Sequence, residues 1–501
     1  MQRSASLLLS AAVSGCVYLT PFEDAQISHA EPAQPDSRIG TLLNQTPAVQ
    51  AHALLVEDPQ LALTSRIDMI DAADDTIDVQ YYIWHNDATG ILVIDKMLSA
   101  ADRGVRIRAL IDDIHLAGLV DRLSALDDHP NIEIRIFNPF SVRLRFSLGL
   151  FRLLEFTIDG NRLNHRMHNK LLVADNQLAI LGGRNIGDEY FGRGDDLNFF
   201  DTDILLSGEI VSELSRGFDE YWNSRWAYPV DALVNFSLSR PDLESVRKRI
   251  HKRLAKHPDL QQLSREVTFE DTIADLLEGP TLLWHTTIVD DPNVAWGDRP
   301  DEIARDLANI ALTAKREVLV ASPYLVPTKN LLEIGKTLTE RGVKITVLTN
   351  SLASNDLVVA NTGYARFRQQ IIDAGINLYE LRADAAVSRS LATHLAEKES
   401  FHSKYIIFDD DLVFIGSLNL DPRSLYLNTE LGVVLQSAAL ATELRASFHT
   451  LIEPENAWRV LSTPDGLRWQ SSAGTVDKQP ASGWQRFWNG VLSLMPVSSQ
   501  L

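Results

Sequence analysis

The chain of 501 residues contains a single cysteine, Cys16. One cysteine excludes an intramolecular disulfide, a zinc site built from several cysteines and an iron–sulfur cluster. Its 47 Lys and Arg residues are outnumbered by 67 Asp and Glu residues, which gives a formal net charge of −20. A general nucleic-acid binder needs a basic surface, so this balance argues against nucleic acid as a partner. No apolar run approaches the roughly 20 residues that cross a bilayer, which argues against a multi-span membrane protein.

What the chain does contain is typical of a globular protein. Hydrophobic residues make up 45% of it and charged residues 23%, which excludes disordered and low-complexity classes. At roughly 150 residues per domain, the length is that of about three domains.

The N-terminus has the pattern of a secretory signal peptide, in which one basic residue, Arg3, precedes a short apolar stretch over residues 5–13. Val13-Ser14-Gly15-Cys16 also resembles a bacterial lipobox, in which the cysteine is lipidated and becomes the mature N-terminus. We predict a signal peptide with lipobox over residues 1–16, a tether over 17–48 and a lipid anchor at Cys16 in the bacterial envelope. The alternatives are a frayed N-terminal helix with an incidental cysteine, and attachment at the periphery of the cytoplasmic membrane.

The chain repeats itself. Residues 76–84 match 317–325, residues 103–110 match 341–348, and residues 168–175 match 402–409, in the same order and at nearly constant separation. Self-similarity of this kind predicts two copies of one domain. We place the copies at 49–230 and 281–455, a helical linker at 231–280 and a Trp-rich tail at 456–501. The amphipathic end of that tail, from Trp484 to Met495, either lies in a membrane interface or caps the fold.

Within each copy, helical and strand-like patterns alternate. Apolar residues follow helical spacing over 61–73 and 90–101, whereas 77–83 and 105–111 are short β-rich apolar runs. This alternation predicts an α/β fold with mixed or parallel sheets flanked by helices.

The repeat carries one polar constellation, His-x-Lys-x4-Asp followed by Gly-x-x-Asn. Its members are His168, Lys170, Asp175 and Asn185 in the first copy and His402, Lys404, Asp409 and Asn419 in the second. Residues i and i+2 of a strand share a face, so histidine and lysine reach into one space. That pairing suits a phosphate with a nucleophile beside it. A lone histidine of this kind is often a buried core imidazole, but recurrence in register favours function.

Two equivalent histidines predict one shared active site on a pseudo-twofold axis. One imidazole attacks phosphorus while the other protonates the leaving oxygen. Each histidine needs a partner that fixes its tautomer, and the aligned segments 201–203 and 428–430 supply Asp203 and Glu430. Solvated strand ends are the alternative for these two acids. No metal and no cofactor is expected, because a lysine on the same face repels a cation and no carboxylate–histidine ligand set accompanies it.

These paired motifs resemble the phospholipase D superfamily, whose two HKD motifs meet at one site and work through a phosphohistidine without metal. Further segments resemble bacterial cardiolipin synthases of the C type: residues 79–84 (VQYYIW), 137–140 (FNPF), 166–170 (RMHNK), 182–191 (GGRNIGDEYF) and 421–424 (DPRS).

The resemblance implies two tandem phospholipase D-like domains and transfer of a phosphatidyl group from a phospholipid, phosphatidylethanolamine in the C-type branch, to phosphatidylglycerol in a bilayer. It implies His168 as the nucleophile and His402 as the acid/base, although the near-symmetry allows the reverse. It also implies a role for Ser417, whose counterpart in the first copy is a glycine, Gly183. It names no protein partner. The alternative function is a hydrolase of the same superfamily, a phospholipase D or phosphodiesterase, in which water takes the phosphohistidine. A third reading is a lipid-binding module without catalytic activity. It would not explain why both constellations are intact.

Overall fold

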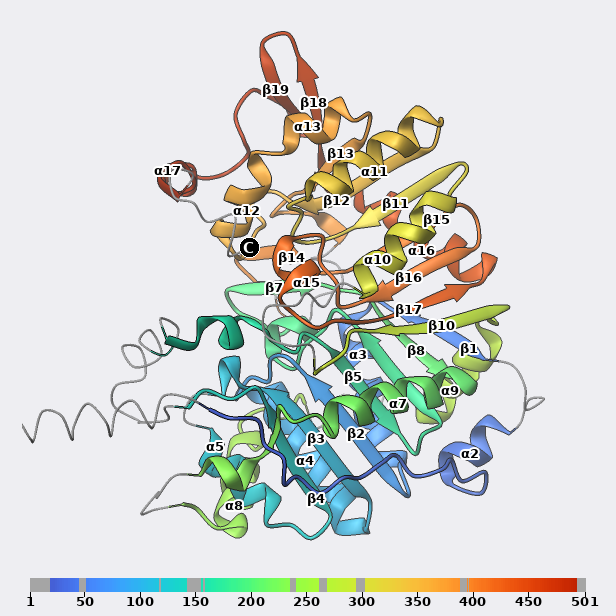
Figure 1. The fold of residues 1–501 in the computed structure, drawn as a ribbon, viewed down its shortest axis with the longest axis vertical. Helices are drawn as coiled ribbons and strands as arrows, with labels where there is room; N and C mark the ends of the chain where they lie inside the picture. Colours follow the sequence, from blue (N-terminus) through green and yellow to red (C-terminus); the bar gives the residue numbers. More distant parts are fainter. Residues whose placement is uncertain are drawn as a thin grey trace, which may run out of the picture.

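The computed structural model describes residues 19–44, 51–116, 119–141, 155, 158–234, 240–260, 268–293, 302–387, 394 and 396–492. Two halves of similar architecture lie one above the other, and each is built on a mixed sheet flanked by helices (Figure 1). The predicted α/β fold with two tandem domains is confirmed.

The first sheet has the strand order β1-β8-β6-β5-β2-β3-β4-β9. β2, β3 and β4 run parallel, and the other neighbours run antiparallel. The strands are β1 (His52–Val56), β2 (Thr76–Tyr81), β3 (Arg106–Asp112), β4 (Ile132–Phe137), β5 (Lys170–Ala174), β6 (Leu178–Gly182), β8 (Asp203–Ser207) and β9 (Ala227–Pro229).

The second sheet repeats this order from β10 to β18 and then adds a hairpin: β10-β17-β16-β15-β11-β12-β13-β18-β19-β20. Its strands are β10 (Trp284–Val289), β11 (Glu317–Ala321), β12 (Lys344–Asn350), β13 (Asn377–Leu381), β15 (Tyr405–Phe408), β16 (Leu412–Gly416), β17 (Leu431–Gln436), β18 (Ala457–Thr463), β19 (Gly466–Ser471) and β20 (Gly474–Val476). Part of the expected tail therefore belongs to the sheet, because β18 pairs antiparallel with β13.

Helix boundaries follow local sequence signals. α3 (Pro59–Ala72) and α4 (Ala88–Arg103) begin at the capping aspartates Asp58 and Asp87, and α4 ends at Gly104, whose φ of 106° favours glycine. The other helices and 3₁₀ turns are α2 (Arg38–Leu43), η1 (Asp113–His115), α5 (Val120–Asp127), η2 (Asp188–Phe191), α7 (Glu209–Trp222), η3 (Val230–Leu233), α8 (Leu243–Leu254), α9 (Phe269–Glu278), α10 (Glu302–Thr313), α11 (Lys329–Glu340), α12 (Val358–Ala365), α13 (Arg368–Asp373), α15 (Pro422–Tyr426), α16 (Ala438–Leu451) and α17 (Gly483–Leu492).

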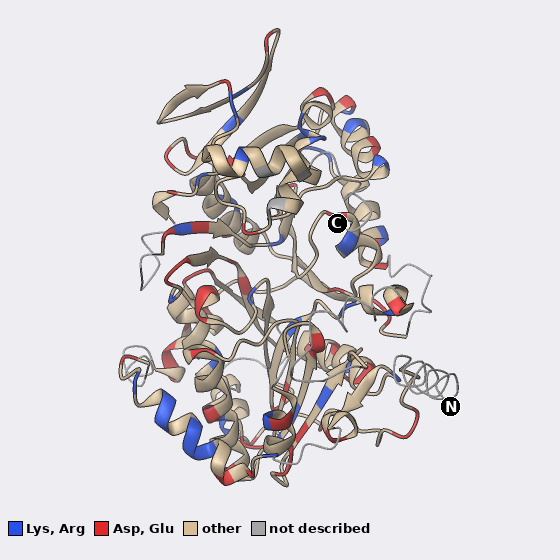
Figure 2. Cartoon of the chain, turned by 90° about the vertical axis from the view of Figure 1, so that its left-hand side faces the viewer, with Lys and Arg blue, Asp and Glu red and all other residues tan. Residues whose placement is uncertain are grey.

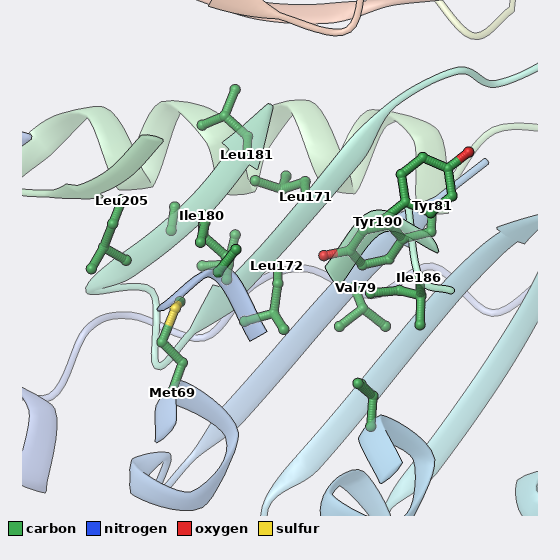
Figure 3. Close-up of a cluster of buried hydrophobic side chains, with 14 of the residues drawn as sticks. Met69, Val79, Tyr81, Leu171, Leu172, Ile180, Leu181, Ile186, Tyr190 and Leu205 are labelled. Atoms are coloured by element: carbon green, nitrogen blue, oxygen red, sulfur yellow. The ribbon is translucent and has the colours of Figure 1, made fainter. Parts of the chain in front are cut away.

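The core of the first half is made of aliphatic side chains from neighbouring strands. Figure 3 shows Val79 of β2, Leu172 of β5, Ile180 of β6 and Leu205 of β8 packed together, with Met69 of α3 nearby. Burying such side chains contributes about 1.5–3 kcal/mol each. This buried apolar layer holds β5 and β6 in place, and these are the two strands beside the residues of the first constellation.

The two halves are joined by main-chain pairing as well as by packing. β7 (Leu197–Phe200) of the first half pairs in parallel with β14 (Lys398–Phe401) of the second, with Phe200 opposite Phe401. An isolated bridge between Met167 and Thr429 repeats this junction on the other side. The ends of the two catalytic segments are thus positioned by the partner half.

Segments outside the two repeats pack on them. Residues 19–44, the described part of the expected tether, lie against the first half, where the Phe22 amide donates to the Arg225 carbonyl at 2.9 Å. α8 packs on α4 and α9 on α3, within the expected linker. Cys16 lies outside the described residues.

Surface charge and membrane-spanning potential complete the description. Acidic and basic residues are spread over both halves, and basic residues gather on α8 of the first half (Figure 2). Across the parts of the chain that the structure describes, no helix is both long enough and apolar enough to span a membrane.

Candidate active site

The two predicted histidines meet at one cavity between the halves. His168 precedes β5 and His402 lies between β14 and β15, so both occupy the same place in their copies. His168 is 6% exposed and His402 4%, and both line a cavity of about 490 Å³. The prediction that the two copies share a single site on a pseudo-twofold axis is confirmed.

Lys170 and Lys404 are buried beside these histidines. Each ammonium group donates a hydrogen bond to the carbonyl oxygen of the histidine two residues before it. Lys404 Nζ also lies 3.0 Å from His402 Nδ1, and Lys170 Nζ lies 5.4 Å from the centre of the Tyr82 ring. In their protonated form the lysines bring positive charge next to both imidazoles, although burial lowers the pKa of both ammonium groups.

Each histidine is held by a carboxylate from the other half. His168 Nδ1 lies 2.9 Å from Glu430 Oε2, and His402 Nδ1 lies 2.6 Å from Asp201 Oδ2. The main chain crosses in the same way, because the His168 amide donates to Thr429 O and the His402 amide to Phe200 O. A carboxylate on Nδ1 sets the tautomer and leaves Nε2 as the nitrogen available for reaction.

The expectation for Glu430 as an orienting residue agrees with this geometry, but the expectation for Asp203 is wrong. Asp203 is fully buried and pairs with Arg66 at 2.7 Å and with Arg184 at 3.3 Å. The reason is strand register: Gly182 pairs with Asp203, whereas the equivalent Gly416 pairs with Gly432. The structural counterpart of Glu430 is therefore Asp201, two residues before Asp203 and just outside β8.

Ser417 supports the second carboxylate. Its hydroxyl donates to Glu430 Oε2 at 2.5 Å and accepts from the Leu431 amide at 3.0 Å. The first copy has Gly183 here, and a Cβ at that position would lie 2.0 Å from Asp201 Oδ1. The carboxylate of Asp201 thus occupies the space that a serine side chain would need.

Burial sets the protonation states of this cluster. It holds the pKa of both imidazoles well below their ordinary value of 6.5, and the adjacent lysines lower these pKa values further. Burial also raises the pKa of Glu430 to about 7, against the opposing charge of Lys170, and it lowers the pKa of Lys404 to about 8. Both imidazoles are consequently neutral near pH 7, the form that can act as a nucleophile or base.

The aspartates of the two constellations are not at the cavity. Asp175 follows the far end of β5 and accepts hydrogen bonds from the amides of Asp74, Asp75 and Thr76 at 2.8–3.0 Å. Asp409 occupies the same place after β15, where it accepts from the amides of residues 315–317. Both tie the end of a catalytic strand to the start of its neighbour. The sequence motif groups them with the catalytic histidines, but this grouping is corrected by the structure, because the length of a strand separates both aspartates from the histidines.

Asn185 and Asn419 both line the cavity, as the spacing predicts. Asn185 Oδ1 accepts from the Ile83 amide at 3.2 Å. Asn419 Oδ1 is buried, and the described residues supply no hydrogen-bond partner for it. A polar atom left in this state at a cavity wall is typical of a position that binds a ligand.

Several cavity residues escaped the sequence reasoning. Tyr82 packs edge-on against His168 and Tyr190 against His402, with ring centres 4.8 and 5.4 Å apart. Glu189 and Arg423 line the same cavity. All four lie in segments already noted for their resemblance to a family, but nothing in the one-dimensional pattern points them inward.

One group of side chains in the described residues has metal-binding spacing. It consists of His85, Asp87 and Glu189, and two of these, His85 and Glu189, also line the cavity. His85 Nδ1 lies 2.9 Å from Glu189 Oε1, so these two atoms already satisfy each other.

Comparison with known families matches this architecture. A family model described as "Cardiolipin synthase, PLD-like domain" matches residues 66–222 and 307–452, which include both histidines and both orienting carboxylates. The chain belongs to this PLD-like cardiolipin synthase family. The family resemblance read from the paired motifs is confirmed.

Individual relatives agree with that assignment. The chain is 36% identical over 452 residues to cardiolipin synthase C of Escherichia coli strain K12, covering 87% of this chain and 93% of the relative. It is 26% identical over 420 residues to a cardiolipin synthase of Geobacillus kaustophilus, covering 83% of this chain and 69% of the relative.

The fold of this family member also recurs in a solved structure. Phosphatidylserine synthase of Haemophilus influenzae aligns over 93% of this chain and 99% of its own, with a TM-score of 0.59 at 15% identity. At that identity the likeness concerns the fold.

Proposed function

We propose that the protein is a cardiolipin synthase that transfers a phosphatidyl group to phosphatidylglycerol through a phosphohistidine intermediate. The observation that carries this proposal is the pair of buried, neutral imidazoles at one cavity, each oriented by a carboxylate of the other half. The similarity to a protein named cardiolipin synthase C over most of both chains supports the choice of reaction.

In the first step, His168 Nε2 attacks the phosphorus of the donor lipid. The bond from phosphorus to the headgroup oxygen breaks, and that oxygen takes the Nε2 proton of His402, which acts in this step in its protonated form because the anionic phosphate beside it favours the positive charge. The donor headgroup leaves as a free alcohol, which is ethanolamine if the donor is phosphatidylethanolamine. Glu430 stabilises the positive charge that forms on His168.

In the second step, His402 takes a proton from a headgroup hydroxyl of phosphatidylglycerol. That oxygen attacks phosphorus, the bond to His168 breaks, and cardiolipin forms. Lys170 and Lys404, with Asn185 and Asn419, stabilise the negative charge on the phosphoryl oxygens. In this scheme side chains act as the nucleophile, transfer the protons and stabilise the phosphoryl charge, so the proposed reaction needs no metal ion.

The test is a vesicle assay with purified protein, phosphatidylethanolamine and phosphatidylglycerol, in the presence of EDTA. We expect cardiolipin and free ethanolamine in equal amounts. Phosphatidic acid as the only product would replace this proposal by a phospholipase D hydrolase. Loss of turnover in EDTA, restored by a divalent cation, would contradict the metal-free scheme.

We also propose that the protein works at a bilayer, anchored through Cys16 as the lipobox pattern indicates. Close to the cavity, α17 packs on α12 and leaves Trp484 and Phe487 68% and 57% exposed, with their rings stacked at 5.9 Å. An exposed aromatic pair on an amphipathic helix suits a membrane interface.

Cys16→Ala should move the protein from the membrane to the soluble fraction in cells. Trp484→Ser combined with Phe487→Ser should weaken binding to vesicles in a protein that lacks the lipid anchor. Unchanged membrane association of Cys16→Ala, with both aromatic residues also replaced, would contradict both contacts.

A further inference from the structure

Two equivalent positions of the repeat carry opposite charges at the shared cavity. η2 begins at Asp188 after β6 ends at Gly182, and α15 begins at Pro422 after β16 ends at Gly416, so the two short helices start at the same distance from their strands. The second residue of each is Glu189 in one copy and Arg423 in the other. Both side chains line the cavity.

Arg423 belongs to the His168 end. Its positive charge is among the causes that lower the pKa of His168, and its guanidinium donates to Asn164 O at 3.3 Å, in the segment that leads to His168. The pseudo-twofold axis relates this pair to Glu189 and His402. In agreement, Tyr190, which follows Glu189, packs against the His402 ring.

The His402 end is therefore the acidic one. Asp356 lines the cavity on this side, where the Tyr324 hydroxyl lies 2.8 Å from both of its carboxylate oxygens and the Tyr324 ring lies 6.5 Å from the His402 ring. Glu189 is paired with His85, and Asp87 and Asp188 lie beside that pair, so three carboxylates surround one imidazole there. At the other end, Asp421 also lines the cavity, and its carboxylate is engaged as the N-cap of α15.

We propose that this charge difference orients the substrates: Glu189 accepts hydrogen bonds from the polar headgroup beside His402, and Arg423 contacts a phosphate oxygen beside His168. The inference rests on the function proposed above and adds the residues that recognise the headgroup. A carboxylate selects groups that donate hydrogen bonds, namely the ammonium of an ethanolamine headgroup or the hydroxyls of a glycerol headgroup. A guanidinium selects phosphate oxygens.

This charge difference also determines which histidine is the nucleophile. In an in-line displacement the leaving group and the incoming alcohol both lie opposite the nucleophile. A headgroup held beside His402 makes His402 the acid and base, and leaves His168 as the nucleophile. The near-symmetry of the two constellations is thus broken by residues next to them.

The experiment compares Glu189→Gln with the matched variant Arg423→Gln in two arms. One arm uses phosphatidylethanolamine with phosphatidylglycerol, and the other uses phosphatidylglycerol alone as donor and acceptor. A lost charge-assisted hydrogen bond costs about 10- to 100-fold in kcat/KM. We expect Glu189→Gln to show this loss, and glutamine retains an acceptor for His85, so folding is preserved.

The two arms separate the two headgroups. A loss confined to the first arm means that Glu189 binds the ammonium of the donor. A loss in both arms, with a larger share of phosphatidic acid among the products, means that it binds the hydroxyls of the glycerol headgroup. Arg423→Gln should instead raise KM for every phospholipid equally. Unchanged kinetics of Glu189→Gln in both arms, or the same headgroup discrimination in Arg423→Gln, would overturn the inference.

A charge exchange gives a second readout that does not depend on rates. In the double variant Glu189→Arg/Arg423→Glu, we expect the phosphorylated residue trapped by acid quench and mass spectrometry to shift from His168 towards His402. Phosphorylation of His168 alone would contradict the proposed polarity. If the wild-type protein forms neither cardiolipin nor phosphatidic acid, the proposed function fails. If the wild-type protein is active and the Glu189→Gln variant has the same kinetics, only this inference is refuted.

Discussion

The first and second copies hold their orienting carboxylates in different ways. In the first copy a glycine, Gly183, leaves room for Asp201, which accepts from the Thr202 amide at 2.9 Å. In the second copy Ser417 donates to Glu430 instead. The eight strands of the first sheet recur in the same order in the second sheet, which adds β19 and β20. Duplication therefore preserved the scaffold while the hydrogen bonds around each histidine changed, and two chemically distinct roles became possible.

The largest effect should come from the histidines themselves. His168→Ala and His402→Ala should each lower turnover by at least about 10⁴-fold, because each removes a group that forms or breaks a bond or moves a proton. Only His402→Ala should still form the phosphatidyl adduct, on His168, as seen by mass spectrometry of quenched enzyme. His129→Ala is the control, since His129 pairs with Asp102 away from the cavity. An adduct on His402 in His168→Ala would reverse the roles of the two copies.

Removing the charge of either orienting carboxylate should lower turnover less than removing a histidine does. Asp201→Asn and Glu430→Gln should each lower kcat by about 10²- to 10³-fold, because the imidazole loses the partner that fixes its tautomer. Single-turnover release of ethanolamine and formation of cardiolipin would separate the two steps.

Asp203→Asn sharpens this comparison. It breaks a buried ion pair with Arg66 and should lower the free energy of unfolding by about 3–5 kcal/mol, with a smaller effect on kcat of the folded enzyme. Chemical denaturation measures the first effect. If Asp203→Asn lost as much kcat as Asp201→Asn does, the register argument would fail.

The hydroxyl present in only one copy should be visible in the pH profile. Glu430 orients His168 as a carboxylate, so its pKa of about 7 should give kcat/KM an acidic limb that rises through pH 7. The Ser417 hydrogen bond lowers that pKa, so Ser417→Ala should move the limb to higher pH by up to about one unit, with less than about tenfold loss at pH 9. A limb that moved to lower pH would contradict this role.

The same group links pH to stability. The pKa of Glu430 is raised in the folded protein above its ordinary value of 4.5, so the folded state binds more protons between pH 4.5 and about 7. Its contribution to the free energy of unfolding is therefore lost as the pH rises through that window. Glu430→Gln should gain stability relative to wild type above pH 7, measured by denaturation at pH 5 and pH 8.

The smallest effect on chemistry should come from the aspartates of the two constellations. Asp175→Asn and Asp409→Asn should change kcat by less than about threefold and lower the free energy of unfolding by about 1–3 kcal/mol, because backbone amides lose their acceptor. The loss should be larger for Asp175, which is buried, than for the half-buried Asp409.

Asp409 adds a pH signature. Desolvation would raise its pKa, but three backbone amides outweigh it and hold the pKa of Asp409 below 3.8. Its stabilising contribution is present above that pH and lost as the pH falls further.

A loss of kcat in Asp175→Asn as large as in Asp201→Asn would contradict the purely anchoring role of the aspartates at the strand ends.

Much of the scaffold was predictable from local pattern. The helix expected over 61–73 is α3, and the strand expected over 77–83 is β2 with a shorter end, because apolar periodicity reports directly on which face is buried. The shared site was also predictable, since two equivalent histidines in register leave few other arrangements. The addition of β18 to the second sheet was not, because pairing at a sheet edge depends on partners far away in the chain.

The sequence by itself determined the duplicated α/β scaffold, the two histidine–lysine pairs and Glu430, because spacing within a strand fixes which side chains share a face. Only the tertiary structure decided that Asp201 rather than Asp203 reaches His402, since that choice depends on the register of β8 against β6. It also placed Asp175 and Asp409 at the far ends of their strands, away from the histidines, and brought Glu189 and Arg423 to the same cavity. These outcomes depend on contacts between segments from different halves of the chain, and no local pattern encodes those contacts.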